Sequence, residues 1–540
     1  MKLSKLFLMG VVVLGLGLTA CNNDVPESGP DVKSNTLASL QISTAKSMFR
    51  ATQADETGRA AESTVAFIDL LSDVANKSWS ALVTAGTSPA DYPAETANFF
   101  NLTNGVYTVS PWKTVAGSQN MALLLNGGSL SNKGAIATAA DYTIALSTDP
   151  IADFSTDDSF VMSSKTFAAN VLPNISQTMI ENKTNTQNVF GTDVERVVCQ
   201  GIVVNGAPVG TDYTAAATTD NKGALSGLKY GGAMGASKTY LYASHAGDRT
   251  MTGTPLDYQG YTSAIHNVAV SATEPTNFTT GDGLNFAKAE LTNLATVQAF
   301  TGTPTARGFY FLENSMALPA SNTDWKYTRS AYAKVYGVYT PAEVWERAAG
   351  DALVFVAKAG TGLWYDTANP GTPPQTSNTT GTLTEGYVKS DKALVKNTTF
   401  TAGTTFYKGE LDGLFYATPE AAFSSVNAPG QKSFMYENGK CVYRSLWNRI
   451  DDGGSPSKTL NGNTRRNNIY VLNVTAFAKV GMNYDPNDPA DPNIPKPTNP
   501  YEPATPQDGS DPTVDQQDTY MRVQATILPW NKVSRDIVLQ

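Results

Sequence analysis

The stretch from Val194 to Val204 reads VERVVCQGIVV and decides the expected fold. Valine and isoleucine are β-branched, and such residues favour strands over helices. A segment of this length that is rich in valine and isoleucine is a strong strand signal. We place the start of a second domain here, so the chain is expected to divide into residues 51–197 and residues 198–540.

Other segments on either side of this stretch also have strand patterns. Residues 37–45 read LASLQISTA, in which Leu40 and Ile42 alternate with polar residues. This period of two predicts a strand with one buried face. Further β-rich runs are expected at residues 333–339, 353–356, 413–416 and 470–474. Together with the abundant Thr, Ser, Asn, Gly and Pro, they predict a mainly β protein with few short helices.

Two local patterns predict other structures. Residues 65–74 (VAFIDLLSDV) have helical spacing and predict a surface helix. Asn438-Gly439, between the runs 434–436 and 441–443, predicts a β-hairpin with a type I′ turn.

Composition limits the class of protein. The 540 residues carry a net charge of −9, with 41% hydrophobic and 16% charged residues, which indicates a globular chain. No basic patch stands out, which argues against a nucleic-acid partner. The chain has three cysteines: Cys21, Cys199 and Cys441. With Cys21 set aside, Cys199 and Cys441 could form one disulfide at most, and two buried free thiols are the favoured interpretation.

The N-terminus has the layout of an export signal. Lys2 and Lys5 precede the apolar run 6–18, which is too short to span a membrane. Leu18-Thr19-Ala20-Cys21 resembles the lipobox of bacterial lipoproteins. We therefore expect residues 1–20 to be a signal peptide, cleaved between Ala20 and Cys21, with a lipid on Cys21. The alternative is an ordinary signal peptide followed by an incidental cysteine.

The C-terminus combines a long Pro/Asp-rich loop with a patterned strand. Residues 484–518 carry proline at frequent intervals among Asp and Asn, which predicts an extended, solvated segment. The strand expected at 520–528 follows, with Met521, Val523, Ala525 and Ile527 alternating with polar residues; a weaker alternation covers 533–539. One interpretation is an edge strand that closes its own sandwich. The other is a strand on a long tether that pairs with another molecule.

The sequence shows no catalytic, cofactor or metal site. The chain has two histidines, His245 and His266, and neither has a neighbour at metal-ligand spacing. No nucleophile elbow, phosphate-binding loop or dinucleotide-binding motif occurs. Residues 485–488 (DPND) match the start of a calcium loop but lack its later Gly and Glu. The aromatic residues Trp325, Trp364, Tyr365 and Trp447 could form a glycan-binding platform or fill the core.

A family resemblance rests on several motifs of the C-terminal half. Residues 465–472 (RRNNIYVL) resemble the R-N-N-x-Y motif of Bacteroidales fimbrillins, the subunits of type V pili. The loop that follows Val480, the segments 517–521 and 526–530, and the block 405–448 are also similar to this family. The resemblance is greatest to the major subunit of the short (minor) fimbriae. Val194-Glu195-Arg196 resembles the family's passage between two domains.

This resemblance implies a fold and an assembly mechanism. Fimbrillins have two transthyretin-like β-sandwiches and are exported as lipoproteins to the outer membrane. An Arg-specific protease removes the first strand, which opens a groove in the N-terminal domain. The C-terminal strand of another copy fills the groove, and repetition builds a fimbria that carries accessory anchor and tip subunits. The function implied is a structural shaft subunit that supports adhesion, with no enzymatic activity.

The implied parts fall on definite residues. Residues 21–50 would be a propeptide that contains the removable strand. Arg50-Ala51 is the expected cleavage site, with Arg59-Ala60 as runner-up. The donor strand would lie within 520–540, with Met521, Val523, Ala525 and Ile527 filling successive pockets. The alternatives are a glycan-binding surface lipoprotein and an anchor or accessory subunit of the same fimbria.

Overall fold

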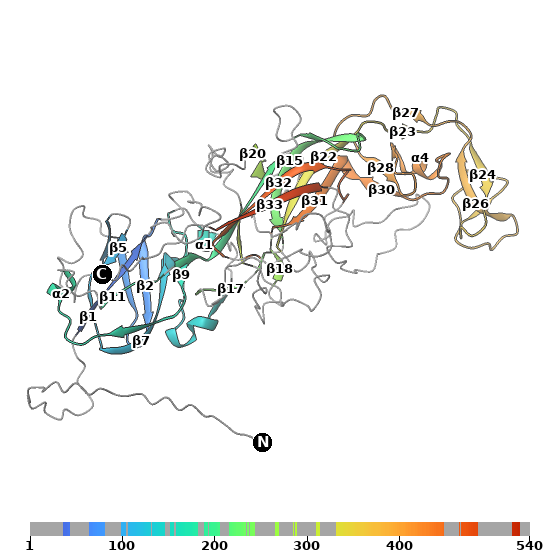
Figure 1. Cartoon of the computed structure of the whole chain (residues 1–540). Coiled ribbons are helices and arrows are strands. Elements are labelled where there is room, and N and C mark those ends of the chain that lie inside the picture. Colours follow the sequence, from blue (N-terminus) through green and yellow to red (C-terminus); the bar gives the residue numbers. More distant parts are fainter. Residues whose placement is uncertain are drawn as a thin grey trace, which may run out of the picture.

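Figure 1 shows the computed structural model of the chain. The structure describes residues 36–43, 64–81, 99–103, 106–130, 132–145, 152–155, 158–181, 188–192, 194–205, 215–233, 235–236, 238–242, 265–268, 284–285, 287–288, 309–313, 331–447, 464, 466–483 and 521–529. These residues are mainly in strands, which confirms the predicted fold class. The described α-helices have only four or five residues each: α1 (Ala152–Ser155), α2 (Gln177–Glu181) and α4 (Pro419–Phe423).

The N-terminal part folds around one large sheet, in the strand order β11-β1-β5-β4-β3-β2-β7-β9-β12. In addition, β6 pairs with β1 and β10 with β7. Its strands are β1 (Thr36–Ser43), β2 (Phe67–Ser72), β3 (Lys77–Ala81), β4 (Phe99–Thr103), β5 (Val106–Val109), β6 (Trp112–Thr114), β7 (Gly117–Leu125), β9 (Met162–Ser164), β10 (Phe167–Val171), β11 (Val189–Phe190) and β12 (Val194–Arg196). We call this the first sheet.

Two further sheets enclose a second core. One has the order β20-β13-β32-β33, with β21 on β13, and the other has the order β14-β15-β22-β31, with β19 on β15. We call them the second and third sheets. Their strands are β13 (Val198–Asn205), β14 (Ala216–Ala217), β15 (Gly223–Ala233), β19 (Leu284–Asn285), β20 (Ala287–Lys288), β21 (Phe309–Leu312), β22 (Tyr332–Pro341), β31 (Lys440–Leu446), β32 (Asn468–Phe477) and β33 (Met521–Pro529).

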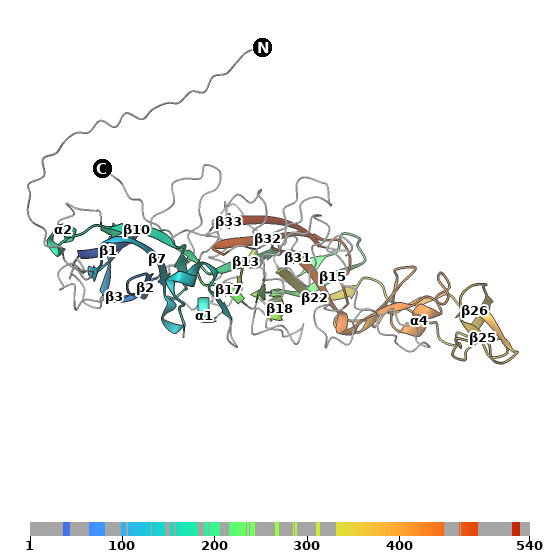
Figure 2. The ribbon, with the colours of Figure 1, turned by 90° about the horizontal axis from the view of Figure 1, so that it is seen from below.

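The chain between β22 and β31 forms a distal module, residues 342–432 together with β30. It contains a sheet of order β27-β23-β29-β28-β30 and a three-stranded sheet of order β24-β26-β25. Both views place the three-stranded sheet at the end of the ribbon remote from β1, with the second and third sheets between them (Figures 1 and 2). The strands are β23 (Trp345–Glu346), β24 (Leu353–Ala357), β25 (Trp364–Asp366), β26 (Leu383–Ser390), β27 (Val395–Lys396), β28 (Phe406–Gly409), β29 (Phe415–Tyr416) and β30 (Ser433–Tyr436).

Short ribbons and 3-10 turns complete the described structure. The ribbons are β8 (Thr143–Ala145) with β17 (Lys238–Tyr240), and β16 (Gly235–Ala236) with β18 (Ile265–Val268). The 3-10 turns are η3 (Gly127–Ser129), η4 (Ile136–Asp141) and η8 (Glu437–Gly439). No described helix is long and apolar enough to cross a membrane.

The stretch from Val194 to Val204 forms β12 and most of β13, and β13 is covered on both faces. Val198 and Ile202 belong to the core of the first sheet, whereas Cys199 and Val203 belong to the second core. β13 pairs in parallel with β32, whose side chains divide between the two cores in the same way. A strand buried on both faces has no solvent-exposed face, which is why apolar residues stand at both odd and even positions of this segment.

The helix expected at residues 65–74 is wrong, because this segment contains β2. Ile68 and Leu70 are buried in the first core, but the opposite face of the strand is covered as well. Asp69 on that face accepts hydrogen bonds from Ser78 Oγ at 2.5 Å and from Lys133 Nζ at 2.8 Å. Burial on both faces removes the period-two alternation, and the remaining pattern resembles that of a helix.

The hairpin expected at Asn438-Gly439 is also wrong, although the turn itself forms. Both residues have positive φ, 52° and 73°, as a type I′ turn requires. However, β30 pairs with β28 in the distal module, and β31 pairs with β22 in the third sheet. The turn therefore passes the chain from one sheet to another.

Both described cysteines are buried free thiols, as the sequence favoured. Cys199 lies on β13, and Cys441 lies on β31, where its Sγ donates to the carbonyl of Gly337 at 3.5 Å. Burial raises the pKa of Cys441 to about 12, so the thiol stays protonated at neutral pH. The second core is therefore held by packing rather than by a disulfide.

Candidate functional site: the first strand, the terminal strand and the junction between them

The strand expected at residues 37–45 is β1, and it lies inside the first sheet. Residues 36–38 pair antiparallel with β6, and residues 41–43 pair antiparallel with β5. Ser39 and Leu40 pair in parallel with β11. Because β1 has neighbours along both edges, its backbone groups are bonded on both sides.

The side chains of β1 fill the first core at every second position. Ala38, Leu40 and Ile42 are all 0% exposed and contact the same core as Trp112 and Val109. Burial of each large aliphatic side chain contributes roughly 1.5–3 kcal/mol relative to exposure. The period-two pattern read from the sequence therefore corresponds to real burial of one face.

Polar contacts hold the start of β1 to the end of the first sheet. The buried Asn188 donates from Nδ2 to the carbonyl of Leu37 at 2.9 Å, and its carbonyl accepts from Ser39 N, also at 2.9 Å. Thr36 Oγ1 donates to the carbonyl of Leu172 at 2.6 Å. Since these partners lie far along the chain, β1 fastens several separate segments together.

The terminal strand β33 lies at an edge of the second sheet. It pairs antiparallel with β32 from Asn468↔Pro529 to Phe477↔Met521, with an irregularity between Val474 and Ala476. No second neighbour of β33 occurs in the described part of the chain. Met521 is 3% exposed and belongs to the second core. Thus β33 already pairs with a strand of its own chain, but along one edge only among the described residues.

A buried ion pair lies where the first and second sheets meet. Arg466, just before β32, donates from Nε to Oε1 of Glu313 at 2.8 Å, and its Nη2 contacts the same oxygen. The backbone N–H of Arg466 donates to Glu313 Oε2 at 3.2 Å. The side chains are 6% and 3% exposed, so the two charges are satisfied by each other and by neighbouring dipoles rather than by water.

The same guanidinium reaches the N-terminal part of the chain. Its Nη1 donates to Ser163 Oγ, on β9 of the first sheet, and to the carbonyl of Leu241, both at 3.4 Å. Its Nη2 donates to Thr239 Oγ1 at 3.3 Å. Arg466 therefore binds acceptors that come from several segments distant in sequence.

Asn467 makes the second polar contact of this junction. Its Oδ1 accepts from the backbone N–H and from Nη1 of Arg196, both at 3.3 Å, and its own N–H donates to the carbonyl of Val198 at 2.9 Å. Its φ is 58°, a conformation that asparagine tolerates better than most residues. Arg196, 1% exposed, ends β12, and Val198 begins β13, so Asn467 bridges the boundary that the sequence placed here.

The other predicted site residues divide into two groups. The lipidation and cleavage residues Ala20, Cys21, Arg50, Ala51, Arg59 and Ala60 lie outside the described residues. Met521, Val523, Ala525 and Ile527 all lie on β33, as the pattern predicted, although their role as donor residues is not tested by this.

Two of the four residues considered for a glycan platform are buried. Trp447 is 0% exposed and stacks on Phe311, with ring centroids 5.5 Å apart. Tyr365 is also buried, in the distal module, whereas Trp364 beside it is half-buried. Trp325 lies outside the described residues. Trp447 and Tyr365 are core residues, which disfavours this arrangement.

No cluster of three or more metal-ligating side chains occurs among the residues with described positions. His245 and residues 485–488 lie outside them, as do residues 533–539.

The C-terminal region matches a known family. Residues 434–536 match the family described as "Major fimbrial subunit protein type IV, Fimbrillin, C-terminal". This region belongs to the fimbrillin family. It contains β31, β32 and β33, and also Arg466 and Asn467 of the junction. The match is to fimbrillins in general and does not single out the major subunit of the short fimbriae, so that finer resemblance stays a prediction.

Several solved structures are similar over most of their length. A proposed cell adhesion protein from Parabacteroides distasonis is 12% identical and covers 92% of this chain and 100% of its own, with a TM-score of 0.39. A fimbrilin from Porphyromonas gingivalis is 12% identical and covers 93% and 99%, with a TM-score of 0.35. A tip fimbrial protein from Porphyromonas gingivalis, truncated at its C-terminus, is 9% identical and covers 92% and 100%, with a TM-score of 0.32. These low scores support no inference about function.

The contacts at this junction give a structural role to two residues of the motif at 465–468. Arg466 and Asn467 are the residues that join the first sheet to the second. Their partner Glu313 was missed by sequence reasoning, since its one local signal is a carboxylate directly after the apolar run of β21.

Truncation of a β1 side chain should destabilise the protein. Leu40→Ala removes a fully buried side chain and should lower the free energy of unfolding by about 2–5 kcal/mol. Gln41→Ala, at a half-buried position on the same strand, is the control and should cost much less. Urea unfolding of the uncut chain measures both, and equal effects would contradict the assignment of Leu40 to the core.

Loss of either junction charge should be severe. Glu313→Gln or Arg466→Met leaves one buried charge uncompensated and should cost about 3–5 kcal/mol of unfolding free energy. The double variant Arg466→Met with Glu313→Leu should recover much of this loss.

The matched control is the exposed pair Lys396–Glu343, whose side chains are 54% and 50% exposed. Glu343→Gln should have little effect on stability, because exposed pairs are screened by water. If Glu313→Gln were as mild as Glu343→Gln in urea unfolding, the junction would not be the structural connection described here.

Proposed function

We propose that this protein is a structural subunit of a fimbrial shaft, which polymerises when the terminal strand of one copy replaces the first strand of another. The observation that carries the proposal is the position of β1. It is an interior strand of the first sheet, yet it lies before Arg50, so a single cut would separate it covalently from the rest of the fold.

Removal of β1 would leave a specific defect. β5 and β6 would lose their partner along one edge, and β11 would lose it along the other. Each buried backbone group left unpaired costs about 1–3 kcal/mol. The apolar contacts of Ala38, Leu40 and Ile42 would also be lost from the core. The cut subunit would therefore bind an extended strand with apolar residues at every second position.

The terminal strand has that pattern. Met521, Val523, Ala525 and Ile527 recur at the spacing of Ala38, Leu40 and Ile42. Pairing of this strand with a neighbour's first sheet would supply main-chain hydrogen bonds for affinity and side chains for specificity. Such a contact joins different surfaces of the two copies, so repetition produces a fibre rather than a closed dimer.

The donor copy must release β33 first. In the uncut chain β33 pairs with β32 along its whole length, and Met521 occupies the second core. The Pro/Asp-rich segment 484–518, which precedes β33, would give the released strand the reach to enter another subunit. Residues 533–539 would extend the donor beyond β33.

The same proposal assigns the export steps and partners. Cys21 would carry the lipid that holds the precursor at the outer membrane, and an Arg-specific protease would release the mature subunit as it joins the fimbrium. The partners are further copies of this chain and accessory anchor and tip subunits, and the role is structural rather than catalytic. An anchor subunit of the same fimbria is the alternative, and the N-terminal residue at the cell surface separates them: Ala51 indicates the shaft and lipidated Cys21 the anchor.

Cleavage at Arg50 should be required for assembly. Trace trypsin added to the purified precursor should produce a ladder of SDS-resistant, heat-sensitive multimers, and Arg50→Ala should abolish it. Arg59→Ala, in the runner-up site, is the matched control and should leave the ladder intact. A chain that is cut after Arg50 and remains monomeric would overturn the mechanism.

Locking β33 onto β32 should block donation. Asn473 and Gln524 face each other in the register of the two strands, so Asn473→Cys with Gln524→Cys can form a disulfide across them. After trypsin treatment the oxidised variant should stay monomeric, and reduction should restore the ladder. Each single-cysteine variant serves as a control. If the oxidised variant assembles normally, the donor lies after Pro529 rather than in β33.

A further inference from the structure

One strand of the distal module has an unpaired edge. β24 (LVFVA) pairs only with β26 among the described residues, and β26 pairs with β25 on its other side. Both views place this sheet at the end of the ribbon remote from β1 (Figures 1 and 2). The strand contains no charged residue and no proline, the features that usually protect a sheet edge from pairing.

The hydrogen-bond pattern shows which groups of β24 face outward. Asp391 N donates to the carbonyl of Ala352 at 2.9 Å, and Lys358 N donates to the carbonyl of Glu385 at 3.4 Å. Because bonded pairs alternate along an antiparallel ladder, the even-numbered residues of β24 bond to β26. The N–H and C=O groups of Leu353, Phe355 and Ala357 therefore point away from β26, and no hydrogen bond to them occurs in the described part of the chain.

Apart from β33, which is assigned above to strand donation and carries Arg522, three other edges of the C-terminal half are shorter or covered. β27 has two residues, one of which is Lys396. β25 is bridged on its outer side by Gln375, which exchanges backbone bonds of 2.8 and 2.9 Å with Trp364. β31 is bridged at Val442 by Met482 in the same way. The edge of β24 is therefore longer and more apolar than that of β27 and, unlike those of β25 and β31, has no bridging residue among the described residues.

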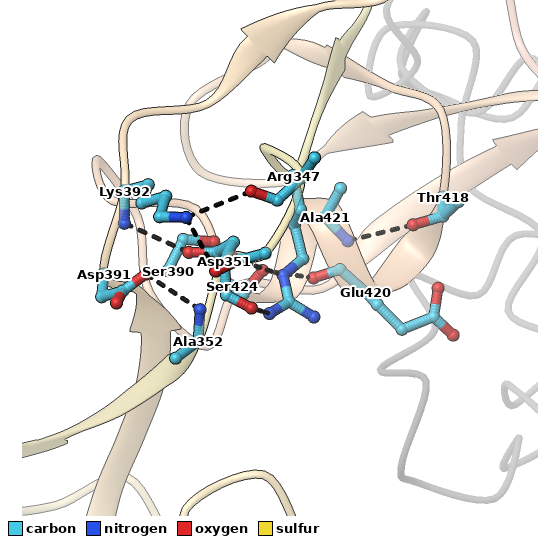
Figure 3. Close-up of polar contacts among 12 residues, drawn as sticks. Arg347, Asp351, Ala352, Ser390, Asp391, Lys392, Thr418, Glu420, Ala421 and Ser424 are labelled. Carbon is cyan, nitrogen blue, oxygen red and sulfur yellow. Dashed lines mark hydrogen bonds and ion pairs between the residues drawn. The ribbon is translucent and has the colours of Figure 1, made fainter.

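The start of β24 is held in place by a polar network, which Figure 3 shows. Asp351 accepts from Arg347 Nε at 2.6 Å and from the N–H of Lys392 at 3.1 Å. Asp391 Oδ1 accepts from the N–H of Ala352 at 2.9 Å, and Lys392 Nζ donates to the carbonyl of Gly350 at 2.7 Å. The edge is therefore fixed before any partner arrives, which lowers the entropy cost of pairing.

The inner face of β24 rests on a very small core. Leu353 and Phe355 pack against Leu363, Tyr365 and Val388. On the opposite face Val354 is 37% exposed. A three-stranded sheet with so little buried area gains more from an added strand than a large sheet does.

We propose that β24 pairs antiparallel with β24 of a second copy of this chain, centred on Phe355. The sequence supports this partner, because the strand reads Val-Phe-Val about its middle and is therefore almost symmetric under reversal. In this register Leu353 faces Ala357, and Phe355 faces its own counterpart, so all the outward-facing groups find partners. Ala352 faces Lys358 and Asp351 faces Ala359, so no like charges oppose each other.

This contact is isologous, so it closes after two copies and cannot itself build a filament. It would join two subunits side by side through their distal modules, and in a fimbria it would connect neighbouring filaments laterally. It is independent of strand exchange, because it uses neither β1 nor β33 and lies at the end of the ribbon remote from β1 (Figure 1). It can therefore be tested on the uncut precursor, in which β1 still fills the first sheet.

The test measures self-association of the full chain with Cys21→Ser by sedimentation velocity over a concentration series. The parent chain should show a reversible monomer–dimer equilibrium. Ala357→Pro removes one outward N–H from each copy and no bond to β26, so it should weaken dimerisation on the order of tenfold without lowering the melting temperature. Leu411→Lys, at a 72% exposed apolar residue elsewhere in the distal module, is the control and should change nothing.

Charge pairs then test the register. In the proposed dimer Val354 faces Val356, so Val354→Lys with Val356→Lys should abolish dimerisation, and Val354→Lys with Val356→Glu should retain it. In the Cys21→Ser chain, a mixture of Val354→Cys and Val356→Cys subunits should form a disulfide-linked dimer on mild oxidation, whereas neither variant should do so alone. A parent chain that is monomeric throughout, or a dimer that tolerates Ala357→Pro and both lysines, would overturn the proposal.

Discussion

The parallel pairing of β13 with β32 is the constraint on which the rest of the fold depends. The two strands are distant in sequence, and each presents one face to the first core and the other to the second core. The first sheet, the third sheet and the terminal strand β33 all pack on or pair with these two strands. Neither core can be completed until residues from both ends of the C-terminal half have come together, so the two cores form a cooperative unit.

The buried junction fixes how these parts meet. A charge at this depth is costly, and replacement of a buried ion pair by apolar residues is often neutral for stability. Its value here lies in specificity, because the guanidinium of Arg466 is satisfied only when Glu313, Ser163 and Thr239 all surround it. Asn467 adds the same requirement at the boundary between β12 and β13. The junction therefore selects one arrangement of the first and second sheets.

Sequence patterns predicted the strands whose burial is regular and missed what depends on distant partners. β1, β13 and β33 were predicted because alternation, or a high content of valine and isoleucine, indicates a strand directly. The helix predicted at 65–74 was wrong because β2 is covered on both faces. The hairpin predicted at Asn438-Gly439 was wrong because a turn fixes the local backbone but not the sheet that each flanking strand joins. The Arg466–Glu313 pair spans 153 residues, and no local pattern identifies such a partner.

The contrast between β1 and β33 explains why the proposed assembly would need a protease. β1 has neighbours on both edges, its alternate side chains are fully buried, and Asn188 binds its first residues. Such a strand would leave slowly, so the uncut chain would be protected from premature exchange. β33 has one neighbour among the residues that the structure describes, and it would detach at lower cost. A cut after Arg50 would make the loss of β1 irreversible, because the released strand would no longer be held at the high local concentration that a covalent link provides. The direction of exchange then follows from the difference between an interior strand and an edge strand.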